Sequence, residues 1–374
     1  MLIKNRFLLI LLFLFTSSII ITSCSDDNDD NIEINSDDDD TGDDDDDTGD
    51  DDDDTGDDDD DDTTNSVDRN SLATNGCQNV VIVNGFAYAA CGQEIEVINL
   101  ATLERNLLNI SGDDITADAD MGLLFTLDLN VINVLSLQDP LNPSMIATTN
   151  TNFSAFSGIG AANGVLVVSA GAGSADTQIF TYTNTTISLA TDGNNTIDNV
   201  TGNPDVHVTP NSNGGLTAFY SQDIGAVANW AIQIADINAN GEVVNTPPSV
   251  VLTPRQFTGG PFGPSNFPVE SEFLNDRLYV AHFGVPGVEI IDLSNNQLLS
   301  PINLSYTPVN IATDGSQLFI IGPTNNDVDV IDPDTNTIVD SIDAALVQST
   351  GVAANNNHIA VADRSDGLIV ITRE

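Results

Sequence analysis

Short paired strands recur along most of this chain. After residue 69, apolar runs rich in Val, Ile, Leu, Phe and Tyr alternate with clusters of Asn, Asp, Gly, Ser and Thr, and no long segment shows the 3.6-residue period of a helix. Alignment of these runs gives seven pairs of strands. The first members cover 86–92, 123–129, 165–171, 216–222, 277–284, 317–322 and 358–363, and the second members cover 94–100, 131–137, 177–183, 231–237, 288–294, 328–334 and 368–374. A regular repeat of paired strands restricts the chain to a few repetitive all-β folds.

A further strand precedes most pairs and another follows, as 308–315 and 337–343 do around the sixth pair. Four antiparallel strands recurring about every 40 residues are typical of a β-propeller blade, so the sequence predicts a seven-bladed β-propeller over residues 69–374. Six or eight blades stay open, because the degenerate stretch 190–270 is long. The chain ends after the seventh pair, and residues 70–76 are expected to supply the missing fourth strand and close the ring.

The clearest repeat, from Pro308 to Asp343, resembles the YVTN and LVIVD propeller repeats. The resemblance extends over most of residues 70–374 and is strongest from residue 276 onward. Seven-bladed propellers of this kind also resemble lactonases and quinoproteins, which place acidic and amide side chains around the central channel. The resemblance therefore implies a scaffold on which either binding or catalysis is possible, and fold alone does not choose between them.

The N-terminal residues predict export. Lys4 and Arg6 precede a mainly apolar run that is short for a membrane span, so residues 1–23 are interpreted as a signal peptide, with a retained signal anchor as the alternative. The four residues that end in Cys24 resemble the lipobox of bacterial lipoproteins. That resemblance implies cleavage before Cys24 and acyl chains on this residue, which would anchor the protein to a membrane.

Residues 24–68 comprise the expected lipidated cysteine and a tether dominated by aspartate, in which the unit TGDDDDD recurs. A segment with so little apolar surface cannot offset the entropy of ordering, so it is expected to be disordered and extended. The residues Ser25 to Asp30 resemble the acidic surface-export signal of Bacteroidetes lipoproteins, although Asn28 interrupts the acidic run. The resemblance implies an outer-membrane lipoprotein facing the cell exterior, with the periplasmic face as the alternative.

Charge and cysteine content support the same compartment. The chain has 57 acidic and 8 basic residues, and a surface with this balance repels phosphate backbones, which excludes nucleic acid as a partner. Cys77 and Cys91 remain as an even pair in a chain expected to leave the cytoplasm, and a disulfide is favoured over two buried thiols. A hairpin turn at Asn84 and Gly85 would place Cys77 opposite Gly92, one residue from Cys91, and a bulge or a slightly wider turn would bring the two sulfurs together.

Candidate site residues lie at the channel mouth. The innermost strands place polar side chains at roughly equivalent positions, and His207 is one of three scattered histidines without a metal-binding spacing. These candidates are Asn79, Asp114, Asp205, His207, Glu270 and Asn310, with Ser157 and Thr350 at the remaining positions. Their oxygens suit calcium, so calcium is a possible ligand, although no resident cofactor and no catalytic residue is predicted. Two calcium-like stretches, 236–241 and 332–337, are interpreted as hairpin turns.

A second candidate surface is the insertion 253–268, in which Arg255, Phe257, Phe262 and Phe267 lie among glycine and proline turns. Aromatic and arginine side chains on a long loop are typical of binding surfaces, and the alternative is that the loop folds back over the propeller.

The sequence lacks a nucleophile elbow, a phosphate-binding glycine loop and an HExxH motif. We therefore expect a non-enzymatic binding or scaffolding module for a protein or glycan ligand, with a lactonase-like propeller enzyme as the alternative.

Overall fold

The computed structural model describes residues 65–373 except 152–155, 171–175, 191–195, 199–205, 212–213, 224–229, 245–248, 253–267, 283 and 296. The expected signal peptide, Cys24 and almost all of the acidic tether lie outside these residues. The described residues form strands β1 to β29 and contain no helix, so none that could cross a membrane is found among them.

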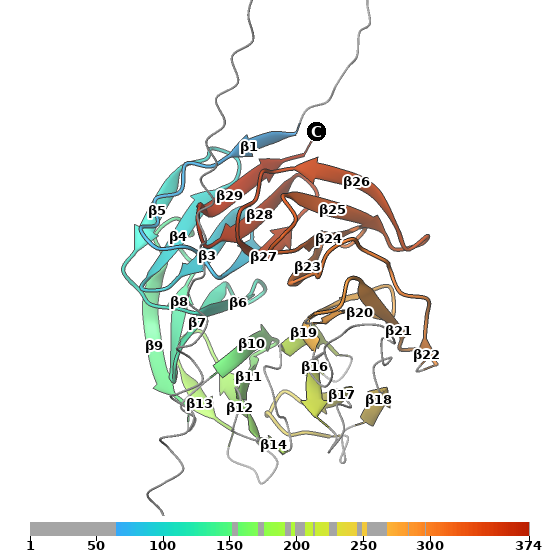
Figure 1. Cartoon of the computed structure of the whole chain (residues 1–374). Helices are drawn as coiled ribbons and strands as arrows, with labels where there is room; N and C mark the ends of the chain where they lie inside the picture. The colour runs from blue at the N-terminus through green and yellow to red at the C-terminus, as the bar shows by residue number, and fades with distance from the viewer. Residues whose placement is uncertain are drawn as a thin grey trace, which may run out of the picture. The chain divides into compact units, whose positions relative to one another are not determined.

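The strands form seven small antiparallel sheets arranged in a ring (Figure 1). Blade one contains β2 (Asn79–Val83), β3 (Phe86–Cys91), β4 (Glu94–Asn99) and β5 (Arg105–Leu108). Blade two contains β6 (Asp114–Asp118), β7 (Leu123–Asp128), β8 (Val131–Ser136) and β9 (Ser144–Asn150). Blade three contains β10 (Phe156–Ala162), β11 (Val165–Ala170), β12 (Asp176–Tyr182) and β13 (Ile187–Leu189), with β14 (Thr196–Asp198) also paired to β12.

The other four blades follow the same order. Blade four contains β15 (Val206–Pro210), β16 (Leu216–Asp223), β17 (Trp230–Ile237) and β18 (Ser249–Leu252). Blade five contains β19 (Pro268–Leu274), β20 (Arg277–His282), β21 (Val288–Asp292) and β22 (Gln297–Leu298). Blade six contains β23 (Asn310–Thr313), β24 (Leu318–Ile321), β25 (Asp327–Asp332) and β26 (Thr337–Asp343). Blade seven contains β27 (Ser349–Ala354), β28 (His358–Asp363), β29 (Gly367–Thr372) and β1 (Ser66–Asp68). The seven-bladed prediction is confirmed.

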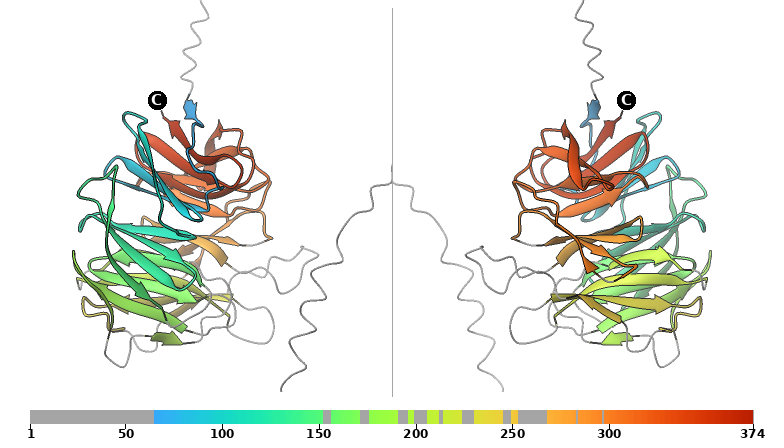
Figure 2. Two further views of the ribbon diagram at one scale, coloured as in Figure 1. Left: turned by 90° about the vertical axis from the view of Figure 1, so that its left-hand side faces the viewer. Right: turned by 90° about the vertical axis from the view of Figure 1, so that its right-hand side faces the viewer.

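The first strand of each blade faces the centre of the ring. These strands contact their neighbours in sequence, from β2 to β6 and onward to β27, which contacts β2 again. The side views show the blades packed face against face (Figure 2). The buried apolar residues that the structure describes form seven clusters, one between each pair of neighbouring blades, such as the cluster that joins Tyr88 of blade one to Leu124 of blade two.

The two ends of the described chain close the ring, but not with the predicted residues. Strand β1 pairs antiparallel with β29, with Val67 opposite Ile371, and lies beside the C-terminus in Figure 1. The prediction that residues 70–76 form this strand is wrong. Ser71 and Leu72 instead donate hydrogen bonds of 2.5 and 2.8 Å to the buried carboxylate of Glu96 on β4, so this segment crosses from blade seven to blade one.

The first hairpin follows the sequence prediction. Asn84 and Gly85 have φ values of 50° and 80°, and Val83 pairs with Phe86. Gly92 has a φ of 74° just after β3, in the turn that joins β3 to β4. Cys77 and Cys91 form a disulfide with a Cα–Cα distance of 3.9 Å, which confirms the predicted pairing.

Close approach of the first strands requires glycine at two positions. At Gly351 on β27, an added Cβ would lie 2.8 Å from the Cα of Asn79 on β2. At Gly160 on β10, it would lie 2.6 Å from Val208 Cγ1 on β15. Neither position has room for a side chain, and the central strands therefore pack tightly around the channel.

Candidate functional site: the central channel and its mouth

The centre of the ring holds two cavities lined by the first strands and the residues next to them. The channel cavity has a volume of about 360 Å³ and is lined by side chains from all seven blades. The mouth cavity has a volume of about 370 Å³ and lies where the first strands begin. Four residues line both cavities and so separate them: Asn79, Asp114, Glu270 and Asn310. We call these four residues the polar belt.

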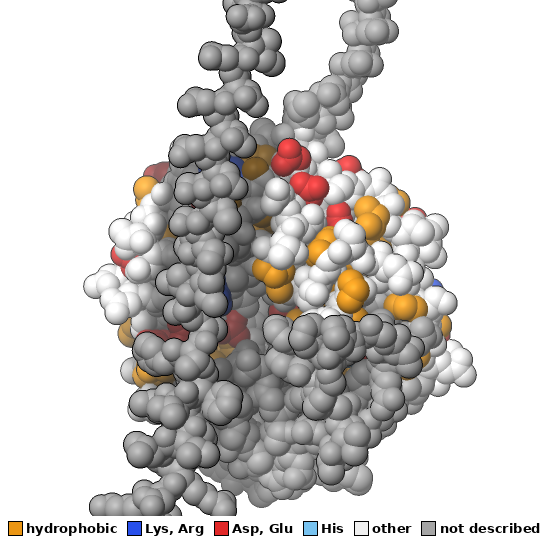
Figure 3. Space-filling model, viewed as in Figure 1, with side chains coloured by type: hydrophobic (Ala, Val, Ile, Leu, Met, Phe, Trp, Pro, Cys, Tyr) orange, Lys and Arg blue, Asp and Glu red, His pale blue; other side chains and the backbone are white. Residues whose placement is uncertain are grey.

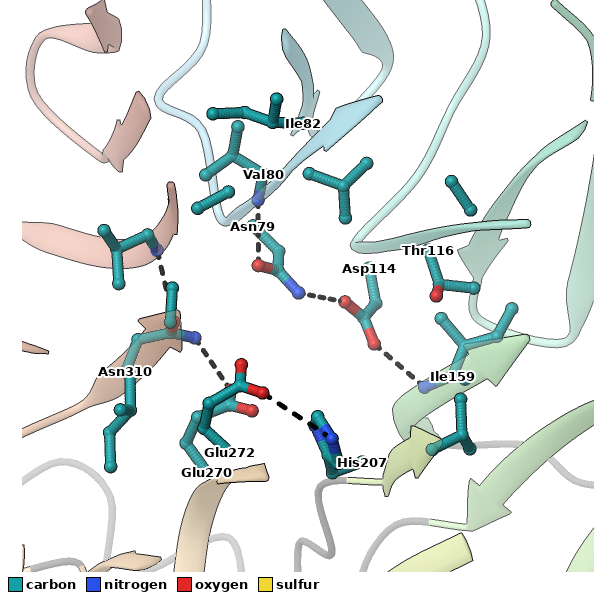
Figure 4. A pocket seen from close by; sticks show the side chains of 18 of the residues that line it. Asn79, Val80, Ile82, Asp114, Thr116, Ile159, His207, Glu270, Glu272 and Asn310 are labelled. Atoms are coloured by element: carbon teal, nitrogen blue, oxygen red, sulfur yellow. Dashed lines mark hydrogen bonds and ion pairs between the residues drawn. The ribbon is translucent and has the colours of Figure 1, made fainter. Parts of the chain in front are cut away.

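One half of the polar belt joins blades one, two and three. The amide Nδ2 of Asn79 donates a hydrogen bond of 2.5 Å to Asp114 Oδ1. The other carboxylate oxygen of Asp114 accepts a hydrogen bond of 3.1 Å from the backbone N–H of Ile159 on β10 (Figure 4). Both side chains also accept a bond from the residue that follows them, at Val80 and Ile115. These bonds fix the side chains before any ligand arrives.

The other half joins blades five, six and seven. Asn310 Nδ2 donates a hydrogen bond of 2.7 Å to Glu270 Oε2, and Asn310 Oδ1 accepts one of 3.2 Å from the backbone N–H of Val352 on β27 (Figure 4). An amide therefore faces a carboxylate on both sides of the mouth. Such pairs position oxygens for binding, but neither supplies a nucleophile with an adjacent base.

Below the belt, the channel cavity contains a histidine and a second glutamate. His207 Nε2 on β15 lies 3.6 Å from Glu272 Oε1 on β19, and both side chains are mostly buried (Figure 4). The His207 ring lies beside Phe219, with ring centroids 6.1 Å apart. Burial lowers the pKa of His207 to about 4, so the imidazole is neutral at neutral pH. This pair joins blades four and five.

The mouth is negatively charged. Asp113, Asp114 and Glu270 line it, and no Lys or Arg is among the described residues that do so. Partial desolvation, and secondarily the charge of Asp128, raise the pKa of Asp113 above its usual value. Acidic side chains also outnumber basic ones on the described surface in Figure 3.

The structure brings together most of the predicted channel residues. Asn79, Asp114, Glu270 and Asn310 form the polar belt, and Thr350 lines the mouth cavity, where its Oγ1 donates a hydrogen bond of 2.9 Å to Cys77 O. His207 lies deeper, in the channel cavity. Asp205 and the side chain of Ser157 lie outside the described residues. The loop candidates Arg255, Phe257, Phe262 and Phe267 also lie outside them.

Three contributors were missed from the sequence. Glu272 is two residues after Glu270, so the two-residue period of a strand places it on the same face, and this signal was available. Asp113 precedes the first residue of β6, and Leu129 occupies the turn between β7 and β8. Neither carries a pattern in the sequence that points to the channel.

The two calcium-like stretches are turns, as predicted. Asn238 Oδ1 accepts hydrogen bonds from the N–H groups of Asn240 and Glu242, and Asp332 Oδ1 accepts one from Asp334 N–H. Among the described residues, the one cluster with metal-ligand spacing is Cys77, Cys91 and Glu96. The disulfide consumes both thiols of this cluster, so it offers no thiolate to a metal.

Comparison with known proteins supports the fold. The sequence matches no protein-family model and no curated protein. A chain of hydrazine synthase from Kuenenia stuttgartiensis superposes with a TM-score of 0.61 at 14% identity, over 79% of this chain and 95% of that one. A chain of the mitotic checkpoint complex gives a TM-score of 0.63 at 11% identity, over 83% of this chain and 92% of that one. At these identities the likeness shows a shared propeller architecture.

Proposed function

We propose that this chain is a non-enzymatic binding or scaffolding module, anchored by lipid on Cys24 to the outer membrane and facing the cell exterior. Its ligand is a protein or a glycan, and the ligand binds at the mouth cavity. The N-terminal signal-like segment, the lipobox-like residues before Cys24 and the acidic stretch after it support this location. Nucleic acid is not a partner, because the chain carries a formal net charge of −49.

The arrangement of the polar belt carries the proposal of binding. Asp114 and Asn310 each bond to two other blades, so the belt residues are held in place by the ring itself. A recess with fixed polar groups at its base is typical of a pre-formed binding site. Nucleophilic catalysis requires a reactive group beside a base, and no such pair is found among the described residues of the mouth.

Binding is tested with the full-length chain on arrays of glycans and of purified surface proteins. A ligand that binds the wild-type chain and is lost in the double variant Asp113→Asn, Glu270→Gln supports the proposal. The control is Asp120→Asn, which changes an exposed carboxylate that lines neither cavity. Ligands that bind the double variant as well as the wild type would exclude the mouth as the site.

The location is tested separately. Protease treatment of intact cells should remove the chain from the surface, while periplasmic markers stay intact. The variant Cys24→Ala should leave the membrane fraction. A chain that is protected in intact cells and digested only after the outer membrane is opened faces the periplasm instead.

The second candidate function is that of a lactonase-like enzyme that uses calcium. The carboxylates of Asp114 and Glu270 favour it, because hard cations prefer oxygen ligands and both line the same mouth. Crystals soaked in calcium, together with a panel of lactones assayed with and without calcium, test this function. Calcium bound to these carboxylates and calcium-dependent turnover that is lost in Glu270→Gln would establish the enzyme.

A further inference from the structure

The mouth combines its acidic lining with an exposed apolar side chain. Leu129 lines the mouth cavity, and its 63% exposure is the largest among the exposed apolar side chains of the described residues. It is the first residue of the two-residue turn between Asp128 and Val131. Leu129 therefore adds an exposed apolar group to the edge of an acidic recess.

The backbone of Leu129 does not explain why leucine occupies this turn. Its φ is 51°, a conformation that favours glycine or asparagine. The turn at Asn84 and Gly85 uses those two residue types. Leucine is therefore the less suitable choice for folding, although its side chain adds apolar surface to the rim.

The charge of the mouth defines the chemistry of the partner. Asp113, which is exposed, and the partly buried Asp114 and Glu270 line the cavity, and Asp128 lies beside Leu129. None of the described lining residues is Lys or Arg. A guanidinium group suits carboxylates of this kind, since it donates several hydrogen bonds and loses little hydration on entering a recess.

We propose that the mouth docks a protein partner that presents an arginine next to an apolar residue. The arginine enters the mouth cavity towards Asp113, Asp114 and Glu270, and its apolar neighbour packs on Leu129. A cavity of about 370 Å³ holds one or two side chains, so the partner inserts a loop and the rest of its surface stays outside. Arginine is one of the residue types that most often anchor protein interfaces. This inference rests on the proposed binding function and names its ligand class.

The test uses two fluorescein-labelled peptides and the full-length chain at low ionic strength. One peptide is Ser-Gly-Leu-Arg-Leu-Gly-Ser, and the other has citrulline, which is neutral and similar in shape, in place of arginine. We expect the arginine peptide to bind at least tenfold more tightly, measured by fluorescence polarisation. Equal affinity of the two peptides, or no binding of the arginine peptide at millimolar protein, would overturn the inference.

Matched variants locate the site. Leu129→Gly should weaken binding of the arginine peptide at least threefold, and Asp113→Asn with Glu270→Gln at least tenfold. Leu103→Gly is the control for the first change, because Leu103 also has a positive φ, of 58°, is 42% exposed and lines neither cavity. Asp120→Asn is the control for charge. Equal effects of Leu129→Gly and Leu103→Gly would also overturn the inference.

The result separates this inference from the proposed function. A glycan from the array that is lost in the mouth variants, combined with no preference for the arginine peptide, would leave the binding function in place and exclude a basic protein partner. Loss of the arginine peptide in the mouth variants supports both.

Discussion

Arg105 Nη2 lies 2.9 Å from Asp68 Oδ2, so an ion pair joins the outermost strand of blade one to the N-terminal strand that completes blade seven. The same guanidinium contacts Glu96 Oε1 at 2.7 Å, and the Glu96 side chain is fully buried. This network of Arg105, Asp68 and Glu96 lies where the ring closes.

Replacing Arg105 should weaken ring closure. Arg105→Met keeps much of the apolar stem but removes the charge that compensates the buried Glu96 carboxylate, and breaking a buried pair costs about 3–5 kcal/mol. The midpoint of denaturant unfolding should fall accordingly. Arg69→Met is the control, because the Arg69–Asp366 pair is about one third exposed and pairs of that kind contribute about 0–1 kcal/mol. Equal shifts for the two variants would contradict the prediction.

Removing the disulfide should also destabilise the ring. Cys77 and Cys91 are 14 residues apart, and a cross-link over a loop of about that length contributes about 3 kcal/mol. The double variant Cys77→Ala, Cys91→Ala should unfold at lower denaturant concentration, and a reducing agent should shift the wild type in the same direction. The reducing agent should not change the variant. A wild type that is insensitive to reduction would show that the cross-link adds little.

Protonation of His207 should make stability depend on pH. The pKa of His207 is lowered by burial to about 4 in the folded chain, against 6.5 when unperturbed, so the unfolded state binds the proton more tightly. Its contribution to stability is therefore complete above pH 6.5 and is lost as the pH falls towards 4. Unfolding midpoints of the wild type and of His207→Gln should converge as the pH falls through this window. Parallel curves for the two proteins would contradict the assignment.

A charge added to the polar belt should separate the first strands. In Asn79→Asp, a carboxylate replaces the amide that donates to Asp114, and like charges at this distance repel. Because a buried hydrogen bond is lost as well, we expect a loss of about 1–3 kcal/mol at pH 7. The loss should shrink below pH 4, where the carboxyls are protonated. Asn356→Asp, at an exposed position, adds the same charge and should have little effect in the same unfolding assay.

The sequence predicted the blades well because each blade is a local unit. The second and third strands of every blade, such as Phe86–Cys91 and Glu94–Asn99, are buried hairpins whose turn residues and apolar runs are adjacent in the chain. Ring closure was predicted in principle, but the strand was placed at 70–76 and lies at Ser66–Asp68. Ser71 lies in the predicted range but contacts Glu96 of blade one and does not pair with β29 as a strand residue. A contact of this kind, between residues far apart in the chain, has no signal in the local sequence.

The contacts of the candidate site were predicted less completely than the blades, because they join residues of different blades. Equivalent positions on the first strands identified Asn79, Asp114, Glu270 and Asn310 as channel residues, since the repeat fixes which residue begins each strand. Which amide bonds to which carboxylate depends on how neighbouring blades are rotated about the channel. The pairing of His207 with Glu272 and the position of Leu129 on the rim depend on the same rotation.

The closure of blade seven by β1 also determines how the propeller responds to a pulling force. Tension on the chain before Ser66 acts first on three residue pairs between β1 and β29, which can separate one after another. The disulfide then passes the force from Cys77 to Cys91, at the end of β3 inside blade one. A pull on the N-terminal side can therefore extract a short segment, but the disulfide shields β2 and β3 from the force, which next acts on the chain that follows Cys91.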